Sequence, residues 1–537
     1  MKRALLSIFF VVVCLAGYSQ SNIDVLHYKY EIELNDKNDS IYGRAEIEFV
    51  LKERSDVYFD LIGNAKKGMQ VTYATVRAKY WPFGMQEPGH YFEHTDNKIS
   101  TPFTISSQVK KGDTLTARIN YKGIPSDGLI ISKNKFGQRT FFSDNWPNRA
   151  HNWIPCNDDP ADKATVEFIV TAPSHYQVIS NGLLVEETNL ADNKKLTHWK
   201  EDVPLPTKVI ALGVADFAVN YVGDVNCIPV SSWVFPEDRK DGFYDYAQAK
   251  EILAFFINYI GPFPYKKLAN VQSKTIFGGM ENAGAIFYSE NSINGKRQEE
   301  DLLAHEIVHQ WFGDMATEKS YAHLWLSEGF ATYLSHVFLE EKYGVAKLDE
   351  LMQADREDVI AFVKSTHKPV VDSVSQLMQL LNANSYKKGG WVLHMLRREL
   401  GDSLFKKAIR QYYASYAGSN AETKDLQKVF EKVSGKDLSA FFKQWLFTPE
   451  NPTLAITWKY DEIKKVANIE IKQLQKAEFQ VPIELGFTSA KGKTIIQKLM
   501  VDSRMKSFTV PLTEKPVSVI ADPKTSLLFE GTVKEIK

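Results

Sequence analysis

The chain has 537 residues, of which 44% are hydrophobic, 24% charged and 12% aromatic, a composition typical of globular domains rather than of disordered or fibrous proteins. Lys and Arg number 65 against 66 for Asp and Glu, so the net charge of −1 provides no global field that would attract nucleic acid. Three cysteines exclude a disulfide scaffold, although the sequence leaves open whether Cys156 and Cys227 pair. The length predicts about three or four domains.

The first 19 residues predict a secretory signal peptide. A basic start precedes an apolar run from Leu5 to Leu15, and small residues follow up to Ser19. The apolar run is shorter than the roughly 20 residues that a membrane-spanning helix needs. We therefore expect cleavage before Gln20, export to the periplasm or the exterior, and no transmembrane span in the mature chain. An uncleaved anchor and a lipid attached to Cys14 are the alternatives.

Residues 20–220 are predicted to form an N-terminal all-β domain. Segments such as His27–Leu34, Arg44–Leu51 and Leu115–Tyr121 alternate apolar and polar residues with a period of two. Clusters of Pro, Gly, Asn and Asp separate these segments. Strands that alternate in this way favour a sandwich or a saddle-shaped sheet.

The pattern becomes helical near Asp241, so residues 221–448 are predicted to form a helix-rich domain. Helical periodicity is clear in Tyr244–Ile260, in Trp325–Leu339 and in Trp391–Leu400. After Pro449 the period of two returns, which predicts a small C-terminal β-sandwich over residues 449–537. The expected fold class is therefore multidomain α+β.

His305-Glu306-Ile307-Val308-His309 is an H-E-x-x-H motif inside a predicted helix. Histidines four residues apart lie on one helix face about 5 to 6 Å apart, so both imidazoles can bind one tetrahedral zinc ion. A catalytic zinc site needs a third protein ligand, and Glu328, 19 positions after His309 on the next predicted helix, can supply it. We predict one Zn2+ per chain, with Glu306 as the base that activates a zinc-bound water. The alternative is that both histidines are hydrogen-bonded without a metal.

Three motifs carry a resemblance to a known family. The first is His305–Asp314, followed by Glu328 in Trp-Leu-Ser-Glu-Gly-Phe-Ala. The second, Gly278–Gly284, resembles a G-x-M-E-N exopeptidase motif, and the third, Ser385–Gly389, is similar to a Y-x-K-G segment. Together they resemble the membrane alanyl aminopeptidase and leukotriene hydrolase family, peptidase family M1 of the gluzincin type. The resemblance extends over nearly the whole mature chain.

This resemblance implies an N-terminal β saddle, a thermolysin-like and mainly helical catalytic domain, and a small C-terminal β-sandwich. Larger relatives carry a further C-terminal helical domain over the cleft. This chain resembles a short form without that domain, so we expect a more open cleft.

The resemblance also implies roles for individual residues. Tyr386 would stabilise the tetrahedral intermediate, and Glu281 would anchor the free N-terminal amine of the substrate. Family members often add a second amine anchor, a Gln or Glu, from the β domain; the matching segment here has neither, and Asp144 is the candidate substitute. Further substrate-binding residues in the exopeptidase motif are Gly278, Gly279, Met280 and Asn282.

The leading hypothesis is a zinc-dependent aminopeptidase that removes N-terminal residues from peptides with a free N-terminus. The alternatives are a thermolysin-like endopeptidase, which the same zinc triad would support, and a catalytically degenerate relative that only binds peptides. The sequence leaves open the preferred N-terminal residue, the physiological peptide, the oligomeric state and the choice between periplasm and exterior.

Overall fold

The structure, a computed structural model, describes residues 22–53, 55–63, 68–78, 90–91, 93–95, 97–101 and 109–536. The predicted signal peptide lies outside these ranges, so its cleavage and the export of the protein stay predictions. Within the described ranges, none of the helices combines the length and apolar character needed to cross a membrane. In the same part of the chain Cys156 is buried, Cys227 is exposed, and both are free thiols.

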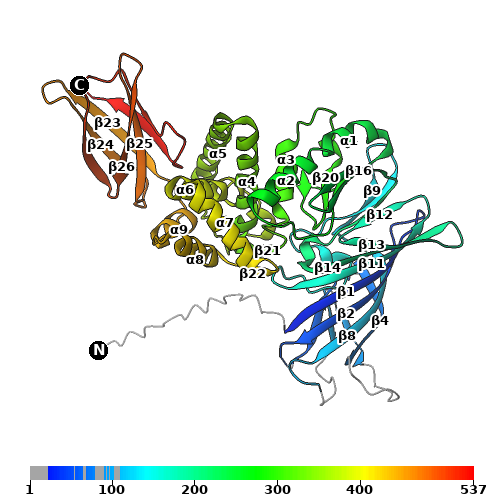
Figure 1. Ribbon diagram of the computed structural model, residues 1–537. Coiled ribbons are helices and arrows are strands. Elements are labelled where there is room, and N and C mark those ends of the chain that lie inside the picture. The colour runs from blue at the N-terminus through cyan, green and yellow to red at the C-terminus, as the bar shows by residue number, and fades with distance from the viewer. Residues whose placement is uncertain are drawn as a thin grey trace, which may run out of the picture.

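The N-terminal domain is built on an eight-stranded sheet (Figure 1). Its centre pairs β1 (Ile23–Glu33) in parallel with β11 (Lys163–Pro173), and alternate residues of β11 are buried, as the period of two predicts. The strand order is β13 (Leu183–Asn189), β14 (Lys194–Pro206), β11, β1, β2 (Ile41–Leu51), β8 (Thr114–Ile124), β4 (Gly68–Ala78) and β5 (His90–Tyr91).

Two smaller sheets complete this domain. One has the order β12 (Gln177–Ser180), β15 (Leu212–Ala215), β10 (Arg139–Ser143) and β9 (Leu129–Lys133). The other has the order β3 (Val57–Asp60), β7 (Lys98–Thr101) and β6 (Glu93–Thr95). The loop that follows β10 carries residues 144–149 towards the helical domain.

A five-stranded sheet precedes and flanks the helices of the middle domain. Its order is β16 (Ala218–Val225), β17 (Ile228–Val234), β18 (Leu268–Ser273), β20 (Ala285–Ser289) and β19 (Gly279–Met280). Strands therefore continue past residue 221, and the first helix begins at Arg239, close to where the helical pattern starts in the sequence. The short edge strand β19 pairs antiparallel with β20 and contains part of the predicted exopeptidase motif.

Nine α-helices follow in the described part of the middle domain. They are α1 (Arg239–Tyr246), α2 (Ala249–Tyr259), α3 (Glu300–His309), α4 (Trp325–Tyr343), α5 (Val345–Thr366), α6 (Gly389–Leu400), α7 (Asp402–Tyr416), α8 (Thr423–Ser434) and α9 (Ser439–Leu446), with a small sheet of β21 (Ala316–Glu318) and β22 (Ser419–Ala421). The single helix predicted over Tyr244–Ile260 is wrong, because the chain breaks between α1 and α2. At the break the side chain of Gln248 donates to the carbonyl of Asp245, an acceptor that a continuous helix would use itself.

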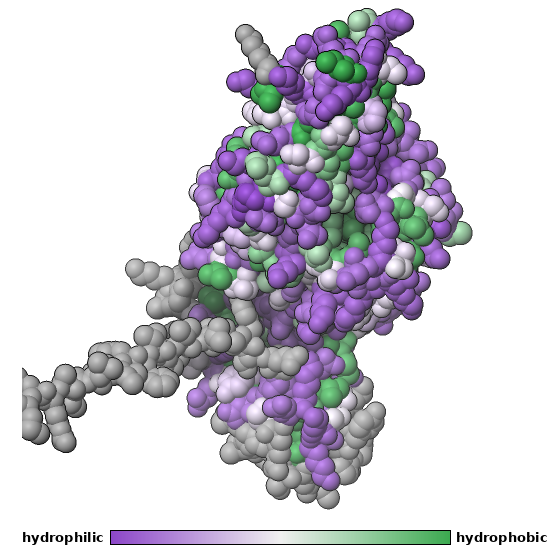
Figure 2. Space-filling model, turned by 90° about the vertical axis from the view of Figure 1, so that its left-hand side faces the viewer, coloured by the Kyte–Doolittle hydropathy of each residue, from purple (hydrophilic) through white to green (hydrophobic). Residues whose placement is uncertain are grey.

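The C-terminal domain consists of two packed sheets. The first sheet has the order β27 (Met505–Pro511), β24 (Val466–Gln473), β23 (Thr453–Asp461) and β29 (Glu530–Glu535). The second has the order β26 (Thr494–Val501), β25 (Val481–Thr488) and β28 (Ser518–Ala521). The order β-rich, helical, β-rich confirms the predicted fold class. Figure 2, which turns the side with this domain towards the viewer, shows a largely hydrophilic surface with apolar side chains in smaller areas.

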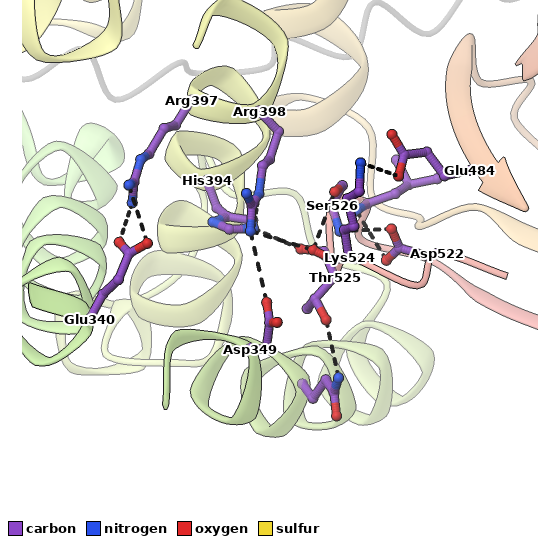
Figure 3. A network of polar contacts seen from close by, with 12 residues as sticks. Glu340, Asp349, His394, Arg397, Arg398, Glu484, Asp522, Lys524, Thr525 and Ser526 are labelled. Atoms are coloured by element: carbon purple, nitrogen blue, oxygen red, sulfur yellow. Dashed lines mark hydrogen bonds and ion pairs between the residues drawn. The ribbon is translucent and has the colours of Figure 1, made fainter. Parts of the chain in front are cut away.

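His394 on α6 joins the C-terminal domain to the helical domain (Figure 3). Its Nε2 lies 2.7 Å from the carbonyl oxygen of Thr525, and its Nδ1 lies 3.0 Å from the hydroxyl of Tyr333 on α4. Burial lowers the pKa of His394 to about 3, so the ring is neutral: Nε2 donates to Thr525 and Nδ1 accepts from Tyr333. Nearby, Arg356 pairs with Asp522 at 2.5 Å. The C-terminal domain thus supports helices that also build the candidate site.

Candidate active site

A cavity of about 540 Å³ lies between α3, α4, β19 and the segment around residue 386. All five residues predicted for zinc binding and catalysis line it, namely His305, Glu306, His309, Glu328 and Tyr386. Four of the predicted substrate-binding residues line it as well: Gly278, Gly279, Met280 and Glu281. The remaining lining residues are Trp146, Phe277, Glu299, Asp301, Leu302, Thr332, Ser335, His336 and Leu381. Asn282 and Asp144 are not among them.

Three ligand atoms lie close enough to share one metal ion. The Nε2 atoms of His305 and His309 are 3.1 Å apart, and Oε2 of Glu328 lies 3.4 and 3.3 Å from them. Ligands about 2.0 to 2.1 Å from a tetrahedral zinc are separated from each other by about 3.3 Å. The triad therefore has the spacing of a zinc site. Oε2 of Glu328 is buried and has no hydrogen-bond partner among the described residues, a deficit that a cation would remove.

His309 is held in the orientation that a metal ligand needs. Its Nδ1 lies 3.2 Å from the carbonyl oxygen of Phe312 and 3.0 Å from Oγ of Ser327. A proton on Nδ1 donates to this carbonyl, which leaves the lone pair of Nε2 directed at the other two ligands. Phe312 and Ser327 were not singled out by the sequence, although both lie close to the motifs.

The charges in this cavity also favour a cation. Burial alone would lower the pKa of His309, but the carboxylates of Glu328, Glu281 and Glu306 outweigh it and raise this pKa to about 10. Burial, together with the charges of Glu281 and Glu328, raises the pKa of Glu306 well above its ordinary value. Without an ion the site therefore takes up protons, and a divalent cation would supply the missing positive charge.

Glu306 lies against the backbone of the exopeptidase motif. It is 5% exposed, and a Cβ built on Gly279 would come within 2.3 Å of its Oε1. A glycine at position 279 leaves the space that the carboxylate occupies. The motif therefore shapes the position of Glu306 as well as the wall of the cavity.

Tyr386 reaches the triad of His305, His309 and Glu328 from a π-helical turn, Asn384–Lys388. Its ring stacks on that of His305, with centroids 5.9 Å apart and an angle of 9° between the planes. Burial, followed by the charge of Glu328, raises the pKa of Tyr386 well above its ordinary value, so its hydroxyl keeps its proton and can donate a hydrogen bond. A π-turn at this point is typical of functional sites.

Gln310 holds the loop that carries Glu281. Its side-chain amide nitrogen donates to the carbonyl of Glu281 at 2.7 Å, and its side-chain oxygen accepts from the backbone N–H of Gly284 at 2.7 Å. The same nitrogen lies 3.0 Å from a carboxylate oxygen of Asp314. Oε1 of Glu281 is buried without a hydrogen-bond partner in the described structure, so it is free to bind a donor. Gln310 and Asp314 stand inside the quoted first motif, but only their contacts reveal this role.

Asn282 supports the same loop from behind. It is fully buried, its backbone N–H donates to the carbonyl of Met280 at 2.9 Å, and its own carbonyl accepts from Ala285 at 3.0 Å. These bonds close a turn directly after Glu281. Asn282 lies outside the cavity lining, and neither polar atom of its side chain has a hydrogen-bond partner among the described residues, so the substrate contact predicted for it stays a prediction.

Asp144 does not reach the cavity, and the substrate-amine role predicted for it does not fit the structure. Its side chain is fully buried, with one oxygen 2.5 Å from Nη2 of Arg149 and the other accepting from Oγ1 of Thr275 and the N–H of Ile276, at 3.1 and 3.0 Å. Both of its carboxylate oxygens are therefore bonded inside the protein. From this segment it is Trp146 that lines the cavity.

Arg149, the ion-pair partner of Asp144, also contacts residues of the cavity wall. Its Nε donates to the carbonyl of Trp146 at 2.7 Å, and its guanidinium lies 5.8 Å from the ring centroid of Phe277. Trp146 and Phe277 contact each other edge to face, with centroids 6.1 Å apart. The Arg149–Asp144 pair thereby fixes two aromatic lining residues contributed by different domains.

Two models of one peptidase family match the chain. Residues 244–445 match the model "Peptidase family M1 domain", and residues 24–209 match "Peptidase M1 N-terminal domain". The chain is 29% identical over 477 residues to "Probable aminopeptidase 2" of Sulfurisphaera tokodaii, covering 81% of this chain and 59% of that protein. It is 30% identical over 319 residues to "Aminopeptidase M1" of Arabidopsis thaliana, covering 56% of this chain and 36% of that protein. The chain thus spans about 36 to 59% of the length of these relatives.

A solved structure has the same fold. The crystal structure of Legionella pneumophila aminopeptidase A in complex with aspartic acid superposes with a TM-score of 0.81 at 19% sequence identity. The match covers 96% of this chain and 60% of that one.

Proposed function

Because the chain belongs to peptidase family M1, we propose that it is a zinc-dependent aminopeptidase that removes residues from the free N-terminus of peptides. The observation that carries this proposal is the presence, in one cavity, of a triad with zinc spacing and of Glu281, whose buried Oε1 has no hydrogen-bond partner among the described residues.

His305, His309 and Glu328 would hold the zinc ion. Zinc bound there would make water acidic enough to attack near neutral pH and would polarise the scissile carbonyl. Glu306, next to this triad and enclosed by Gly279, would accept the proton of the attacking water and pass it to the leaving amine.

Tyr386 would stabilise the charge that develops on the carbonyl oxygen. Its hydroxyl is protonated, and its ring is fixed against His305, so it can donate without reorganisation. Glu281 would bind the α-ammonium of the substrate, a charge-assisted bond that an internal peptide segment cannot form. The distance from Glu281 to the triad then selects the first peptide bond for cleavage.

The test compares a peptide with a free N-terminus with its N-acetylated form. We expect cleavage of the free peptide only, with a chelator abolishing it and added zinc restoring it. Glu281→Gln, which keeps the shape of the side chain but not its charge, should raise KM for the free peptide and reduce discrimination against the acetylated one.

The same test separates the two alternatives. Equal cleavage of both peptides, or cleavage at internal bonds, would identify an endopeptidase. A protein that binds peptides but cleaves neither form, and whose binding is unchanged in Glu306→Gln, would be a degenerate relative.

Export is a separate part of the proposal and rests on the first 19 residues of the sequence alone. Expression of the full chain should give a mature N-terminus at Gln20 outside the cytoplasm, which N-terminal sequencing would test.

A further inference from the structure

The residues of the Gly278–Glu281 segment contact α3 in sequence order, and this order defines a direction along the cavity. The carbonyl of Glu281 is bound by Gln310, Gly279 lies against Glu306, and Gly278 lies 3.7 Å from Cδ1 of Leu302, measured from a Cβ built on it. Moving from Glu281 to Gly278 therefore means moving along α3 towards its N-terminus.

Helix α4 forms a second wall of the cavity and runs antiparallel to α3. Glu328 of α4 lies at the two histidines, whereas Lys342, near the end of α4, lies 2.5 Å from Glu300 at the start of α3. The two helices are antiparallel, and Figure 1 shows them next to each other. Residues of α4 beyond Glu328 consequently face the N-terminal turn of α3.

A substrate with its amine at Glu281 must continue past the triad into this end of the cavity. At a rise of 1.5 Å per residue, Asp301 of α3 lies about 6 Å along the helix axis from His305, and Glu299, the residue before α3, lies about 9 Å from it. An extended peptide advances about 3.3 Å per residue. The side chains of the second and third substrate residues therefore come within reach of Asp301 and Glu299.

Two carboxylates, Glu299 and Asp301, are among the polar groups at this end of the cavity. Among the described residues, Glu299 and Asp301 form no ion pair, and the like charge of Asp301 adds to burial in raising the pKa of Glu299. Nε2 of His336 lies 3.0 Å from Oδ2 of Asp355, and the buried Nδ1 of the same ring has no hydrogen-bond partner in the described structure.

A fourth polar group points to a missing ligand. Thr332 is 7% exposed and lines the cavity, and its Oγ1 has no hydrogen-bond partner in the part of the chain that the structure describes. Leu302 and Leu381 add apolar surface beside these groups. No Lys or Arg occurs among the described residues that line the cavity.

We propose that this end of the cavity, formed by Glu299, Asp301, Thr332 and His336, binds a basic side chain, and that the enzyme prefers peptides with Lys or Arg at the second or third position. Lys and Arg offer only hydrogen-bond donors, and the carboxylates of Glu299 and Asp301 and the hydroxyl of Thr332 can accept them. Their aliphatic stems would pack on the two leucines while the charged end reaches the carboxylates. This inference rests on the proposed aminopeptidase function.

The experiment uses peptides that share one N-terminal residue and differ at the second or third position, with Lys, norleucine or Glu there. Norleucine has nearly the length of Lys without its charge. We expect kcat/KM to favour Lys over norleucine by about tenfold, since two partly exposed carboxylates contribute, and Glu to be the poorest. Added salt should reduce the preference for Lys, because it screens exposed charges.

Glu299→Gln combined with Asp301→Asn should reduce the preference for Lys to about twofold or less. Glu341→Gln, an exposed carboxylate on α4 outside the cavity, is the matched control and should keep the full preference. Thermal melting of each variant shows that it is folded.

The outcomes separate this inference from the proposed function. Cleavage of all the peptides with no preference for Lys, or a preference that survives the double substitution, overturns the inference and leaves the aminopeptidase intact. No release of the N-terminal residue from any of these peptides overturns the proposed function itself.

Discussion

Gly329 on α4 and Gly389 at the start of α6 cross so closely that a Cβ built on Gly329 would lie 2.9 Å from Cα of Gly389. Gly329 directly follows the ligand Glu328, and Gly389 is three residues beyond Tyr386. This contact between two backbones therefore sets the distance between the zinc triad and the tyrosine that would stabilise the intermediate.

Gly329→Ala should separate these two elements. We expect a loss of about 1 to 3 kcal/mol in the free energy of unfolding from overpacking, and a fall in kcat larger than the change in KM. Denaturant titration and steady-state kinetics measure both. Gly390→Ala, whose added Cβ would be 3.4 Å from the nearest atom, is the control and should have little effect on kcat. If Gly329→Ala and Gly390→Ala lowered kcat and the free energy of unfolding equally, the contact between Gly329 and Gly389 would not be what positions Tyr386.

Glu328→Gln should weaken metal binding. The amide removes the negative charge that balances the ion, so zinc per chain measured after dialysis should fall well below one. Glu306→Gln should retain full zinc occupancy while losing turnover, because Glu306 acts on the reaction and not on the ion. Full zinc content in the Glu328 variant would show that the triad is assigned wrongly.

Tyr386→Phe should lower kcat by roughly 100- to 1000-fold with little change in KM, because it removes a donor used only as charge develops on the carbonyl oxygen. The ring stacking on His305 is kept in this variant, and so should zinc content be. A rise in KM at constant kcat would instead assign Tyr386 to substrate binding.

Asp144→Asn should affect stability more than amine recognition. Removing the charge partner of Arg149 from a buried pair should lower the free energy of unfolding by about 2 to 4 kcal/mol. Combining it with Arg149→Met should cost less than the sum of the two single changes, which a double-mutant cycle measures. A selective rise in KM as large as that of Glu281→Gln, without loss of stability, would restore Asp144 as an amine anchor.

Lys388→Met should change how stability depends on pH. Lys388 is fully buried, donates to the carbonyl of Glu450 at 3.1 Å, and has its pKa lowered by burial from 10.5 to about 7. Below about pH 7 both the folded and the unfolded chain carry this charge, and the folded chain bears the cost of burying it. Between about pH 7 and 10.5 the folded chain releases the proton first, so wild-type stability rises with pH through this window.

The methionine variant lacks this titration. It should be more stable than wild type by about 1 to 3 kcal/mol near pH 6, and the difference should vanish or reverse near pH 10, where the neutral amine still donates to Glu450. Thermal or denaturant unfolding across this range measures the difference. A constant difference at all pH values would mean that Lys388 does not titrate in this window.

Local sequence patterns predicted much of the fold because they act over short distances. The buried face of β11 follows directly from the alternation of its residues, and α4 follows from helical periodicity. Hydrophobic periodicity does not predict the break between α1 and α2, where the side chain of Gln248 donates to the carbonyl of Asp245, because it does not report such polar contacts.

The candidate site, like the fold, was predictable from the sequence only in part. The positions of His305 and His309 on one helix face follow from their spacing alone, because helical geometry fixes residues four apart. The third ligand is different. Oε2 of Glu328 lies 3.3 and 3.4 Å from the two imidazole nitrogens because α4 packs against α3, and the motif alone does not determine this packing.

By itself the sequence determined the chemistry that is available: two imidazoles on one helix face, carboxylates near them, and a tyrosine in a matching segment. The tertiary structure decided which of these groups meet. Asp144 is close in sequence to Trp146, which lines the cavity. Its carboxylate is nevertheless buried in an ion pair with Arg149, five residues later. The contacts of Gln310 with Glu281 and Gly284 likewise exist only in the folded chain. A buried charge or amide binds the nearest partner that folding provides, and that partner is set by long-range packing.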